Sequence, residues 1–489
     1  MMRLLLSEDI RKVEQNASNY LTYLSMMENA SRAVVSELCR RQQVNGKNII
    51  VITGSGNNGG DGYGVARMLS DEGAFVKVMA VGSPKSETAQ KMRSYFGGEI
   101  TDYQPSLILN ADIVVDALFG IGLTHEADSF YTDIIKAVNE SSAYTVSIDI
   151  PSGLFADSNK EYTCVKADLT VTFIAYKKCQ LLYPAREFCG EICLSNIGIP
   201  SCAYEGVDEI GKIISAPVFE KRKSNTHKGS YKTASLVVGS YGMTGAAVLS
   251  IRGCLKSGIG LAKACIQDEI YPIVTSNVPE AVCEIYSSQS DSSSIAEMAL
   301  SADATLVGCG FAKSEKKKEI VKEIIKSAEN ILIIDADGLN LICDDIECIK
   351  RSKADIVITP HPAEMARLCK VSVKEIENDR IYYAKAIAAS LRCTVVLKGS
   401  VTIICSKEGR LFFNLTGNAG MATGGSGDVL AGVIVSLAAQ YGDSLKAATD
   451  GVYIHGLAGD MAKNIKGEIS MLPSDLIECL PDVFKKLTR

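Results

Sequence analysis

Residues 416–430 read TGNAGMATGGSGDVL and decide the architecture of the C-terminal half of the chain. The glycines at 424, 425 and 427 precede a strongly apolar segment with helical spacing, so we predict a helix from Asp428 to about Gln440. Free N–H groups at such a helix start bind anions, and Asp428 is placed to accept a proton. A capping aspartate alone would not explain the Gly-Gly-Ser-Gly approach. The stretch therefore predicts a phosphoryl-transfer site, and the absence of GxxxxGK[ST] from the sequence excludes a P-loop enzyme.

The segments on either side of this stretch alternate between strands and helices. Short apolar runs in the second half predict strands at 235–239, 304–308, 331–335, 355–359 and 394–398, with a hairpin at 401–405 and 411–414. The first half has similar runs at 48–53, 75–81, 112–116, 144–149 and 169–173, with helices predicted at about 63–71 and 130–139. The fold class is therefore α/β, with a doubly wound parallel sheet in the first half.

The alternation stops between residues 200 and 228, which contain two prolines and a basic cluster at 221–223. We place the boundary here, with one domain at 1–215 and a second at 222–489. A chain of 489 residues suits two cores. The composition, 47% apolar and 22% charged, is typical of globular proteins.

The overall composition excludes several classes of partner. The net charge of −6 argues against nucleic acid and anionic membranes. The longest uncharged apolar stretch, 429–441, falls short of the ~20 residues of a membrane span. The sixteen cysteines form no CxxC pair, so we read them as small apolar residues in a reducing cytoplasm.

A first candidate site lies in the N-terminal half, where residues 54–62 read GSGNNGGDG between a predicted strand and helix. Backbone N–H groups there could bind a phosphate, and the oxygens of Asn57, Asn58 and Asp61 could hold a monovalent cation. A structural turn is the alternative. Asp116 and Asp149 each end an apolar strand at the same sheet edge, where they could act as base, metal ligand or ribose anchor, or cap a turn.

Two further segments of the second half carry polar groups at strand ends. Residues 398–402, KGSVT, could grip nucleotide phosphates or form an ordinary turn. His361 stands between two prolines, which fix its backbone. It is either a substrate contact or a buried, hydrogen-bonded histidine.

Together these motifs resemble the bifunctional NAD(P)H-hydrate repair enzymes. That family joins a Rossmann-like NAD(P)HX epimerase domain to an ADP/ATP-dependent NAD(P)HX dehydratase domain of ribokinase-like fold. The resemblance covers nearly the whole chain. It rests on residues 27–30, 57–62, 116–122 and 149–153 in the first half, and on 227–229, 245–247, 335–337, 359–362, 398–399 and 418–430 in the second.

The resemblance implies a role for each matching residue. In the epimerase, the hydrate contacts would be Asn57, Asn58, Gly59, Gly60, Asp61, Gly120, Ile121, Gly122, Leu123, Thr124, His125, Glu126 and Asp149, and potassium would be held by Asn58, Asp116 and Ser152. In the dehydratase, Ala246, Gly310, His361 and Asp428 would face the hydrate, and Lys398, Gly399, Ser400, Val401, Thr402 and Gly427 would bind ADP or ATP. The chain departs from the family at Gly308-Cys309-Gly310, where GPG is usual, and at His361-Pro-Ala-Glu364, where HPGE is usual.

The implied chemistry agrees with these residues. Hydroxide is a poor leaving group, so phosphorylating the hydrate's hydroxyl lets the ring nitrogen expel phosphate and restore the dihydropyridine. Asp428 would be the base, and magnesium is expected on the phosphates. The first domain would interconvert the two epimers of NADHX and NADPHX, with Asp149 as its acid–base group and Asp61 as the second candidate. We expect a cytoplasmic homo-oligomer. Two alternatives remain: a ribokinase-like small-molecule kinase, and an N-terminal module that only senses nucleotides or binds protein.

Overall fold

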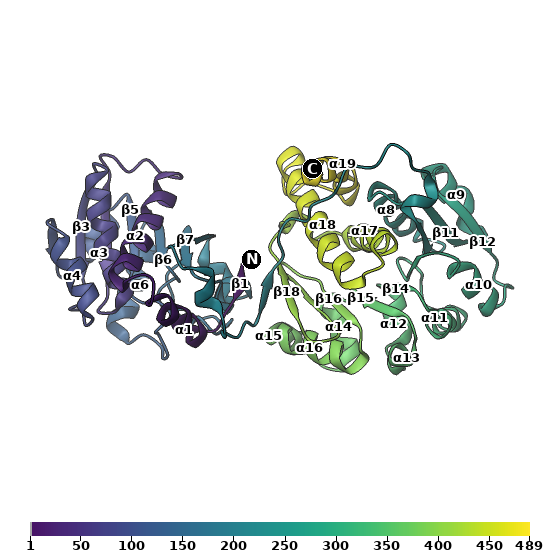
Figure 1. The fold of residues 1–489 in the computed structure, drawn as a ribbon, viewed down its shortest axis with the longest axis horizontal. Helices are drawn as coiled ribbons and strands as arrows, with labels where there is room; N and C mark the ends of the chain where they lie inside the picture. Colours follow the sequence, from purple (N-terminus) through teal and green to yellow (C-terminus); the bar gives the residue numbers. More distant parts are fainter. Residues whose placement is uncertain (1) are drawn as a thin grey trace. The chain divides into compact units, whose positions relative to one another are not determined.

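The computed structural model describes residues 2–489 as two compact units, Met2–Gly211 and Lys212–Arg489. Each unit is an α/β assembly on a largely parallel sheet, which confirms the predicted fold class (Figure 1). No helix in the described part of the chain is both long and apolar enough to cross a membrane. All sixteen cysteines have free thiols.

The N-terminal unit has a seven-stranded, entirely parallel sheet in the order β4-β3-β2-β5-β6-β7-β8. Strands β5 and β7 are buried along their whole length, and β2 and β6 are buried beyond their first residue, as the apolar runs predicted. The elements are β1 (Arg3–Leu4), α1 (Ser7–Ala17), α2 (Tyr23–Cys39), β2 (Asn48–Thr53), α3 (Asn57–Asp71), β3 (Phe75–Ala80), α4 (Glu87–Tyr95), β4 (Glu99–Thr101), α5 (Pro105–Leu109), β5 (Ile113–Ala117), α6 (Ser129–Glu140), β6 (Tyr144–Ile148), β7 (Leu169–Phe173), α7 (Lys178–Leu181) and β8 (Glu191–Ser195).

The C-terminal unit has a sheet in the order β9-β18-β17-β16-β15-β14-β13-β10-β11-β12. The strands from β16 to β12 are parallel, and β17 runs antiparallel to both neighbours, as the predicted hairpin requires. The strands are β9 (Gly211–Ile213), β10 (Thr233–Val237), β11 (Leu261–Gln267), β12 (Val282–Tyr286), β13 (Ala304–Val307), β14 (Ile331–Ile334), β15 (Asp355–Ile358), β16 (Thr394–Leu397), β17 (Thr402–Cys405) and β18 (Leu411–Asn414).

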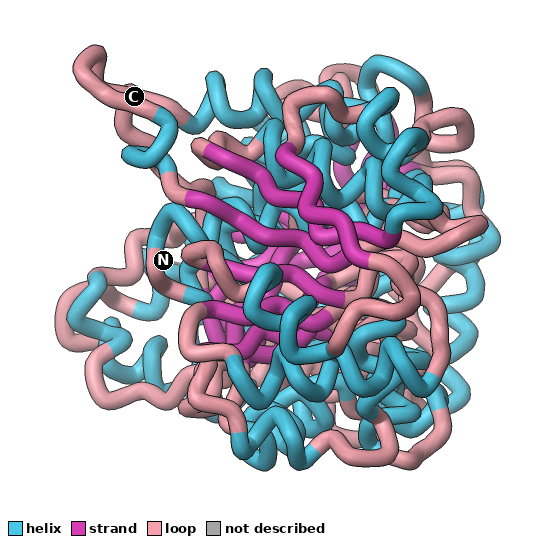
Figure 2. The backbone as a smooth tube through the Cα atoms, turned by 90° about the vertical axis from the view of Figure 1, so that its right-hand side faces the viewer, coloured by secondary structure: helices cyan, strands magenta, loops and turns pink. Residues whose placement is uncertain are grey.

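Helices cover both faces of this second sheet, and Figure 2 shows the strands as a layer between them. One face carries α8 (Thr244–Lys256), α17 (Ser426–Tyr441), α18 (Ser444–Lys466) and α19 (Pro473–Leu487), and the other carries the helices from α11 to α16 (Figure 1). The remaining helices are α9 (Tyr271–Asn277), α10 (Ser292–Ala299), α11 (Glu315–Ser327), α12 (Asp337–Ile342), α13 (Glu347–Arg351), α14 (Pro362–Cys369), α15 (Val373–Asn378) and α16 (Arg380–Leu391).

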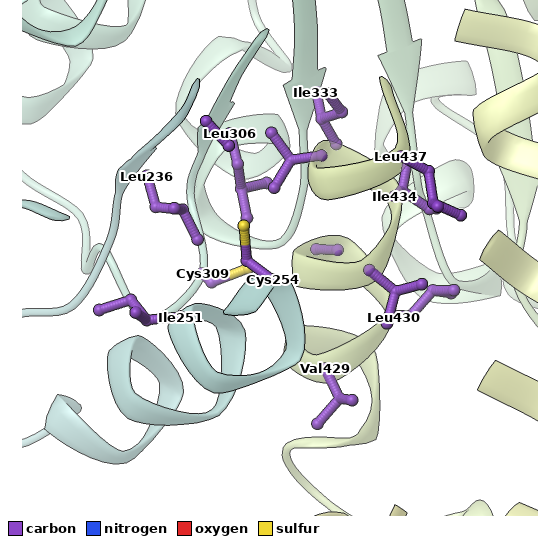
Figure 3. Close-up of a cluster of buried hydrophobic side chains, with 14 of the residues drawn as sticks. Leu236, Ile251, Cys254, Leu306, Cys309, Ile333, Val429, Leu430, Ile434 and Leu437 are labelled. Atoms are coloured by element: carbon purple, nitrogen blue, oxygen red, sulfur yellow. The ribbon is translucent and has the colours of Figure 1, made fainter. Parts of the chain in front are cut away.

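Helix α17 is the centre of the largest apolar core. Its residues Leu430, Ile434 and Leu437 pack with side chains of the sheet and of α8, including Leu306 and Ile333 (Figure 3). The helices α17 and α8 approach closely because glycines lie where the two helices touch. A Cβ at Gly432 would overlap the carbonyl of Ser250, so only glycine permits this packing. The start of α17 is therefore held rigidly.

Two helix starts differ from the sequence prediction. Helix α3 begins at Asn57 rather than near Tyr63, so the second half of the glycine-rich stretch is helical and not a loop. Helix α17 begins at Ser426, two residues before Asp428. In both cases glycines in the first turn lowered the apparent helical propensity, but tertiary packing compensates. At position 60, for example, there is no room for a side chain, because a Cβ added to Gly60 would lie 2.6 Å from the sulfur of Met27.

Candidate functional site

Asp428 lies in the first turn of α17, which follows a glycine that the geometry requires. Gly425 has φ +102°, in the left-handed region, and an added Cβ would lie 2.6 Å from a methyl of Leu249. Burial raises the pKa of Asp428 to about 6, and repulsion from Asp335 contributes. A carboxylate that titrates near 6 is ionised at neutral pH yet remains a useful base, which suits proton abstraction from a hydroxyl.

Lys398, at the end of β16, forms an ion pair with the buried carboxylate of Asp335, at the end of β14. Its Nζ donates to Oδ1 of Asp335 at 2.7 Å and lies 3.9 Å from a carboxylate oxygen of Glu364. Asp335 also accepts from Thr359 at 2.6 Å. A Cβ added at Gly427 would lie 3.4 Å from the same Nζ, so the lysine stands over the start of α17. The fold thus brings Lys398, Gly427 and Asp428 together beside free helix N–H groups, an arrangement that binds anions.

The residues 399–402 form a tight turn after β16. The hydroxyl of Thr402 donates to the carbonyl of Gly399 at 3.2 Å. Arg380 donates to the carbonyls of Lys398 and Val401 at 3.0 and 3.4 Å, and a Cβ at Gly399 would collide with its guanidinium. Ser400 is exposed at the tip. The turn is held from behind by Arg380, which leaves its outer face free.

His361 caps α14 and is half exposed. Its Nδ1 accepts from the N–H groups of Ala363 and Glu364 at 3.1 and 3.4 Å. Burial, with the charges of Lys398 and Arg367, lowers the pKa of His361, so the ring is neutral at pH 7. Because it caps a helix at the surface, it is not the fully buried histidine that was one of the two predicted alternatives.

Gly310 and Ala246 lie against each other at the start of α8. Gly310 has φ +57°, and an added Cβ would lie 2.6 Å from that of Ala246. Cys309 follows β13, and its Sγ donates to Asp335 at 3.6 Å. The potential ligand atoms of Cys309, Asp335 and Asp428 all lie within 4.8 Å of one another. The predicted hydrate contacts Ala246 and Gly310 therefore lie at the same strand-end edge as Asp428.

Sequence reasoning missed His455, which lies on α18 and is buried. Burial lowers the pKa of His455 to about 4, and a hydrogen bond with the backbone of Ser426 only partly offsets this effect. Its Nε2 has no partner among the described residues. A neutral histidine thus supports the first turn of α17 from behind. Its only sequence signal was that the chain contains just four histidines.

The N-terminal unit contains a cavity of about 890 Å³, a size suited to a small-molecule ligand. Nine of the predicted hydrate contacts line it: Asn57, Asn58, Asp61, Gly120, Ile121, Gly122, Leu123, His125 and Asp149. The other four, Gly59, Gly60, Thr124 and Glu126, are not among its lining residues. The two glycines instead allow α3 to pack closely, since side chains there would collide with Gly54 and Met27.

Asp149 follows β6 and carries a strained backbone with φ +68°. Its Oδ1 accepts hydrogen bonds from Lys177, from Thr172 at 2.9 Å and from the N–H of Phe173 at 3.4 Å. The side chain of Lys177 is only 1% exposed. Sequence reasoning missed this lysine, because nothing in a pair of adjacent lysines after a strand indicates that one of them is buried.

Two more carboxyl groups line the same cavity. Burial raises the pKa of Asp61 well above its ordinary value, and repulsion from Asp149 and Glu14 contributes. Burial likewise raises the pKa of Glu14, with Asp149 adding to the shift. One carboxyl group is therefore paired with a lysine, while burial raises the pKa of the two others.

The predicted potassium ligands surround Phe119. Asn58 donates to the Phe119 carbonyl at 3.0 Å, and the hydroxyl of Ser152 accepts from its N–H at 2.9 Å. Ser152 also donates to Asp116 at 2.5 Å. Asp116 lies inside β5 and is 1% exposed, with hydrogen bonds from hydroxyl and backbone groups only. Burial raises the pKa of Asp116, so a bound cation would offset the cost of its charge.

Comparisons with known proteins match both units. A family model described as NAD(P)H-hydrate dehydratase matches residues 234–482, and one described as YjeF-related protein N-terminus matches residues 24–179. A "Bifunctional NAD(P)H-hydrate repair enzyme Nnr" from Thermofilum pendens is 36% identical, over 89% of this chain and 87% of its own length. That from Escherichia coli is 33% identical, over 97% and 92%.

A solved structure, the ADP/ATP-dependent NAD(P)H-hydrate dehydratase from Bacillus subtilis co-crystallised with ATP and Mg²⁺, is 30% identical. It covers 55% of this chain and 95% of that one, with a TM-score of 0.49. The sequence relatives alone span both units at more than 30% identity. The resemblance inferred from the motifs is thereby confirmed, and the chain belongs to the bifunctional NAD(P)H-hydrate repair enzymes.

Proposed function

We propose that residues 222–489 dehydrate S-NADHX and S-NADPHX through a phosphorylated intermediate, and that residues 1–215 interconvert the R and S epimers. The chain is thus both a lyase and an isomerase. The observation that carries the proposal is the position of Asp428. A carboxyl group with a pKa of about 6 stands at an anion-binding helix start, directly beside the Lys398 ammonium.

In the dehydratase, Asp428 takes the proton of the hydrate's hydroxyl as that oxygen attacks the terminal phosphorus. The N–H groups at the start of α17, around Gly427, stabilise the charge on the transferring phosphoryl group. Lys398 holds the leaving phosphate, and the turn at Gly399, Ser400, Val401 and Thr402 holds the remainder of the nucleotide. ADP and ATP both fit this role, because the catalytic groups address only the terminal phosphate. Magnesium would accompany the nucleotide and neutralise its phosphates.

The hydrate binds against Ala246, Gly310 and His361. Residues 246 and 310 are small, and Gly310 packs so closely on Ala246 that a side chain there would collide with it. The His361 ring is half exposed there, and its Nε2 lies 3.3 Å from a carboxylate oxygen of Glu364. Phosphate then leaves with the electron pair of its C–O bond as the ring nitrogen donates its lone pair, and loss of a proton restores the dihydropyridine.

In the epimerase, the cavity lined by Asn57, Asn58, Asp61 and Asp149 receives either hydrate. Asp149 is the acid–base group. Potassium would be held by oxygens of Asn58, Asp116 and Ser152, with the Phe119 carbonyl beside them. Oxygen donors suit a hard cation, and Asp116 has no cationic partner among the described side chains. The cation would orient the loop at 119–122.

We also propose a cytoplasmic homo-oligomer. Sixteen free thiols suit a reducing compartment. Ile465, Ile469 and Leu472 are exposed large apolar side chains of the kind that a subunit contact covers. Light scattering on the purified chain measures the oligomeric state.

The test is a coupled assay on the purified full-length chain. S-NADHX with ADP or ATP and Mg²⁺ should regain the 340 nm absorbance of reduced nicotinamide, and R-NADHX should do so through epimerisation. Omission of the nucleotide is the control. Absence of any regain from S-NADHX, with protein shown to be folded by circular dichroism, would overturn the dehydratase assignment. Phosphorylation of a stable alcohol would indicate a small-molecule kinase instead.

A further inference from the structure

The side chains around the N-terminal cavity divide the acid and base roles of epimerisation, an inference that rests on the function proposed above. Asp149 is held at one carboxylate oxygen only. Lys177, Thr172 and the Phe173 N–H all address Oδ1, whereas Oδ2 has no hydrogen-bond partner among the described residues. Because Asp149 lines the cavity, Oδ2 is the oxygen left for a ligand.

Lys177 is the group that makes this arrangement possible. Its ammonium also donates to Thr172 at 2.7 Å and to the Phe173 carbonyl at 3.1 Å, so all three of its donors are used. A buried lysine with this set of acceptors is charged and immobile. It fixes the orientation of the Asp149 carboxyl group, which stands on a strained backbone.

Asp61 has the opposite environment. It lines the same cavity from α3, and no described side chain forms an ion pair or hydrogen bond with its carboxyl group. Burial, with repulsion from Asp149 and Glu14, raises the pKa of Asp61 well above its ordinary value, which suits a proton donor. Glu14 also lines the cavity, but the charges of Lys177 and Arg11 lower its pKa and partly offset the effect of burial. The ionisable side chains around the cavity are Arg11, Glu14, Tyr23, Asp61, His125, Asp149 and Lys177.

We propose that Asp149 is the general base and Asp61 the general acid of epimerisation, and that Lys177 is the positioning residue that holds Asp149 by Oδ1 and leaves Oδ2 for the substrate. The reacting centre of the hydrate is a carbon that carries both a hydroxyl group and the ring nitrogen. Such a centre can invert by opening and reclosing the ring. The alternative, loss of hydroxide, would create the cation from which simple proton loss restores the cofactor, and the nucleotide-dependent second site would then be superfluous.

Oδ2 of Asp149 takes the hydroxyl proton, the O–H electron pair forms the C=O bond, and the C–N bond breaks. Its electrons go to the ring nitrogen, which takes the proton of Asp61. Rotation about the adjacent C–C bond presents the other face of the aldehyde. The nitrogen then attacks that face and returns its proton to Asp61, while the oxygen takes the proton back from Asp149.

The first experiment measures the pH dependence of R-to-S conversion by chromatography, without nucleotide, using the full-length chain. In K177M the kcat of R-to-S conversion should fall while the KM for the hydrate changes little, because Asp149 loses the group that orients its carboxyl group. The maximal rate should fall at least about tenfold, and K177R should restore most of it. In D61N the fall of the rate at high pH should disappear, with a loss of about 10²-fold.

Controls separate folding from chemistry. The circular dichroism spectrum and the melting temperature report whether each variant is folded, and dehydration of S-NADHX by the same preparations should be unchanged. E14Q is the matched carboxyl variant. If E14Q rather than D61N removes the fall at high pH, the assignment of Asp61 is wrong. If K177M folds and keeps the wild-type kcat, the role of Lys177 is wrong. A wild-type chain that does not epimerise at all would instead overturn the proposed function of the first domain.

The second experiment distinguishes ring opening from loss of hydroxide. Epimerisation in H₂¹⁸O should leave the ¹⁶O of the substrate hydroxyl in most of the product when it is quenched after one turnover. Incorporation of one ¹⁸O for every inversion would show that the C–O bond breaks, and it would overturn the ring-opening step.

Discussion

Replacement of Asp428 by asparagine should abolish dehydration and yet stabilise the protein at neutral pH. The two side chains have nearly the same shape, so the start of α17 and its apolar core remain intact. What changes is a charge that the folded state holds at a cost. That cost arises from burial and from repulsion by Asp335.

The magnitude of both effects follows from the pKa of Asp428. Folding raises it from an ordinary 3.8 to about 6, which corresponds to about 3 kcal/mol against the ionised form. Stability from the neutral carboxyl is therefore fully present below about pH 4 and is lost as the pH rises through about 6. Asparagine carries no charge at any pH. D428N should thus be more stable than the wild type by up to about 3 kcal/mol above pH 7, and equally stable near pH 4.

The assays measure melting temperature and both activities from pH 4 to 8. A gain of about 3 kcal/mol corresponds to a rise in Tm of about 6 °C in a domain of this size. Dehydration by the wild type should increase with pH up to about 7, because the base must be ionised, and D428N should lose about 10²- to 10⁴-fold. Epimerisation should be unchanged.

The matched control is D450N. Asp450 is also a buried aspartate of the C-terminal unit, but it has a cationic partner, Lys446, at 2.6 Å. This variant should keep dehydratase activity and should not gain stability at pH 7. If D428N retains dehydration within tenfold of wild type, Asp428 is not the base. If its stability gain is absent at pH 7 while folding is normal, the physical account of the raised pKa is wrong.

Three further predictions address the remaining groups. G427A should raise the KM for nucleotide at least about fivefold without loss of Tm, because the new methyl meets only the flexible end of Lys398 at 3.4 Å. The matched variant G432A should instead lower the Tm, because its methyl would collide with the backbone of α8. K398M should raise the KM for nucleotide by about tenfold or more and destabilise the fold by about 3 kcal/mol, because Asp335 would remain buried without its cation. Denaturant titration measures this loss of stability. If K398R, which keeps the positive charge, lost as much stability as K398M, the loss would not be an effect of charge. Exchange of potassium for a large organic cation should slow epimerisation but not dehydration, and D116N should abolish the difference between the two salts; equal rates in both salts for the wild type would refute the cation site.

The sequence predicted the parallel strands well, because a strand buried on both faces is a continuous apolar run that needs no knowledge of its neighbours. It also located Asp428 and Asp149, since each carboxylate directly follows such a run or a glycine-rich turn. It was wrong about where α3 and α17 begin. The glycines that lower helix propensity there are the residues that let each helix approach its neighbours, and that gain is visible only in the packing.

The order of the motifs along the chain was by itself sufficient to determine the α/β fold class and the family, because both depend on local patterns and their spacing. Only the tertiary structure decided the electrostatic state of each site. The raised pKa of Asp428 depends on burial and on Asp335, 93 residues away in the sequence. The ion pair of Asp149 depends on Lys177 at the end of a different strand. Desolvation and Coulomb forces act over a few ångströms of space, whatever the separation along the chain. The loop GGSGD could therefore indicate a phosphoryl-transfer site but not the protonation state of its carboxylate.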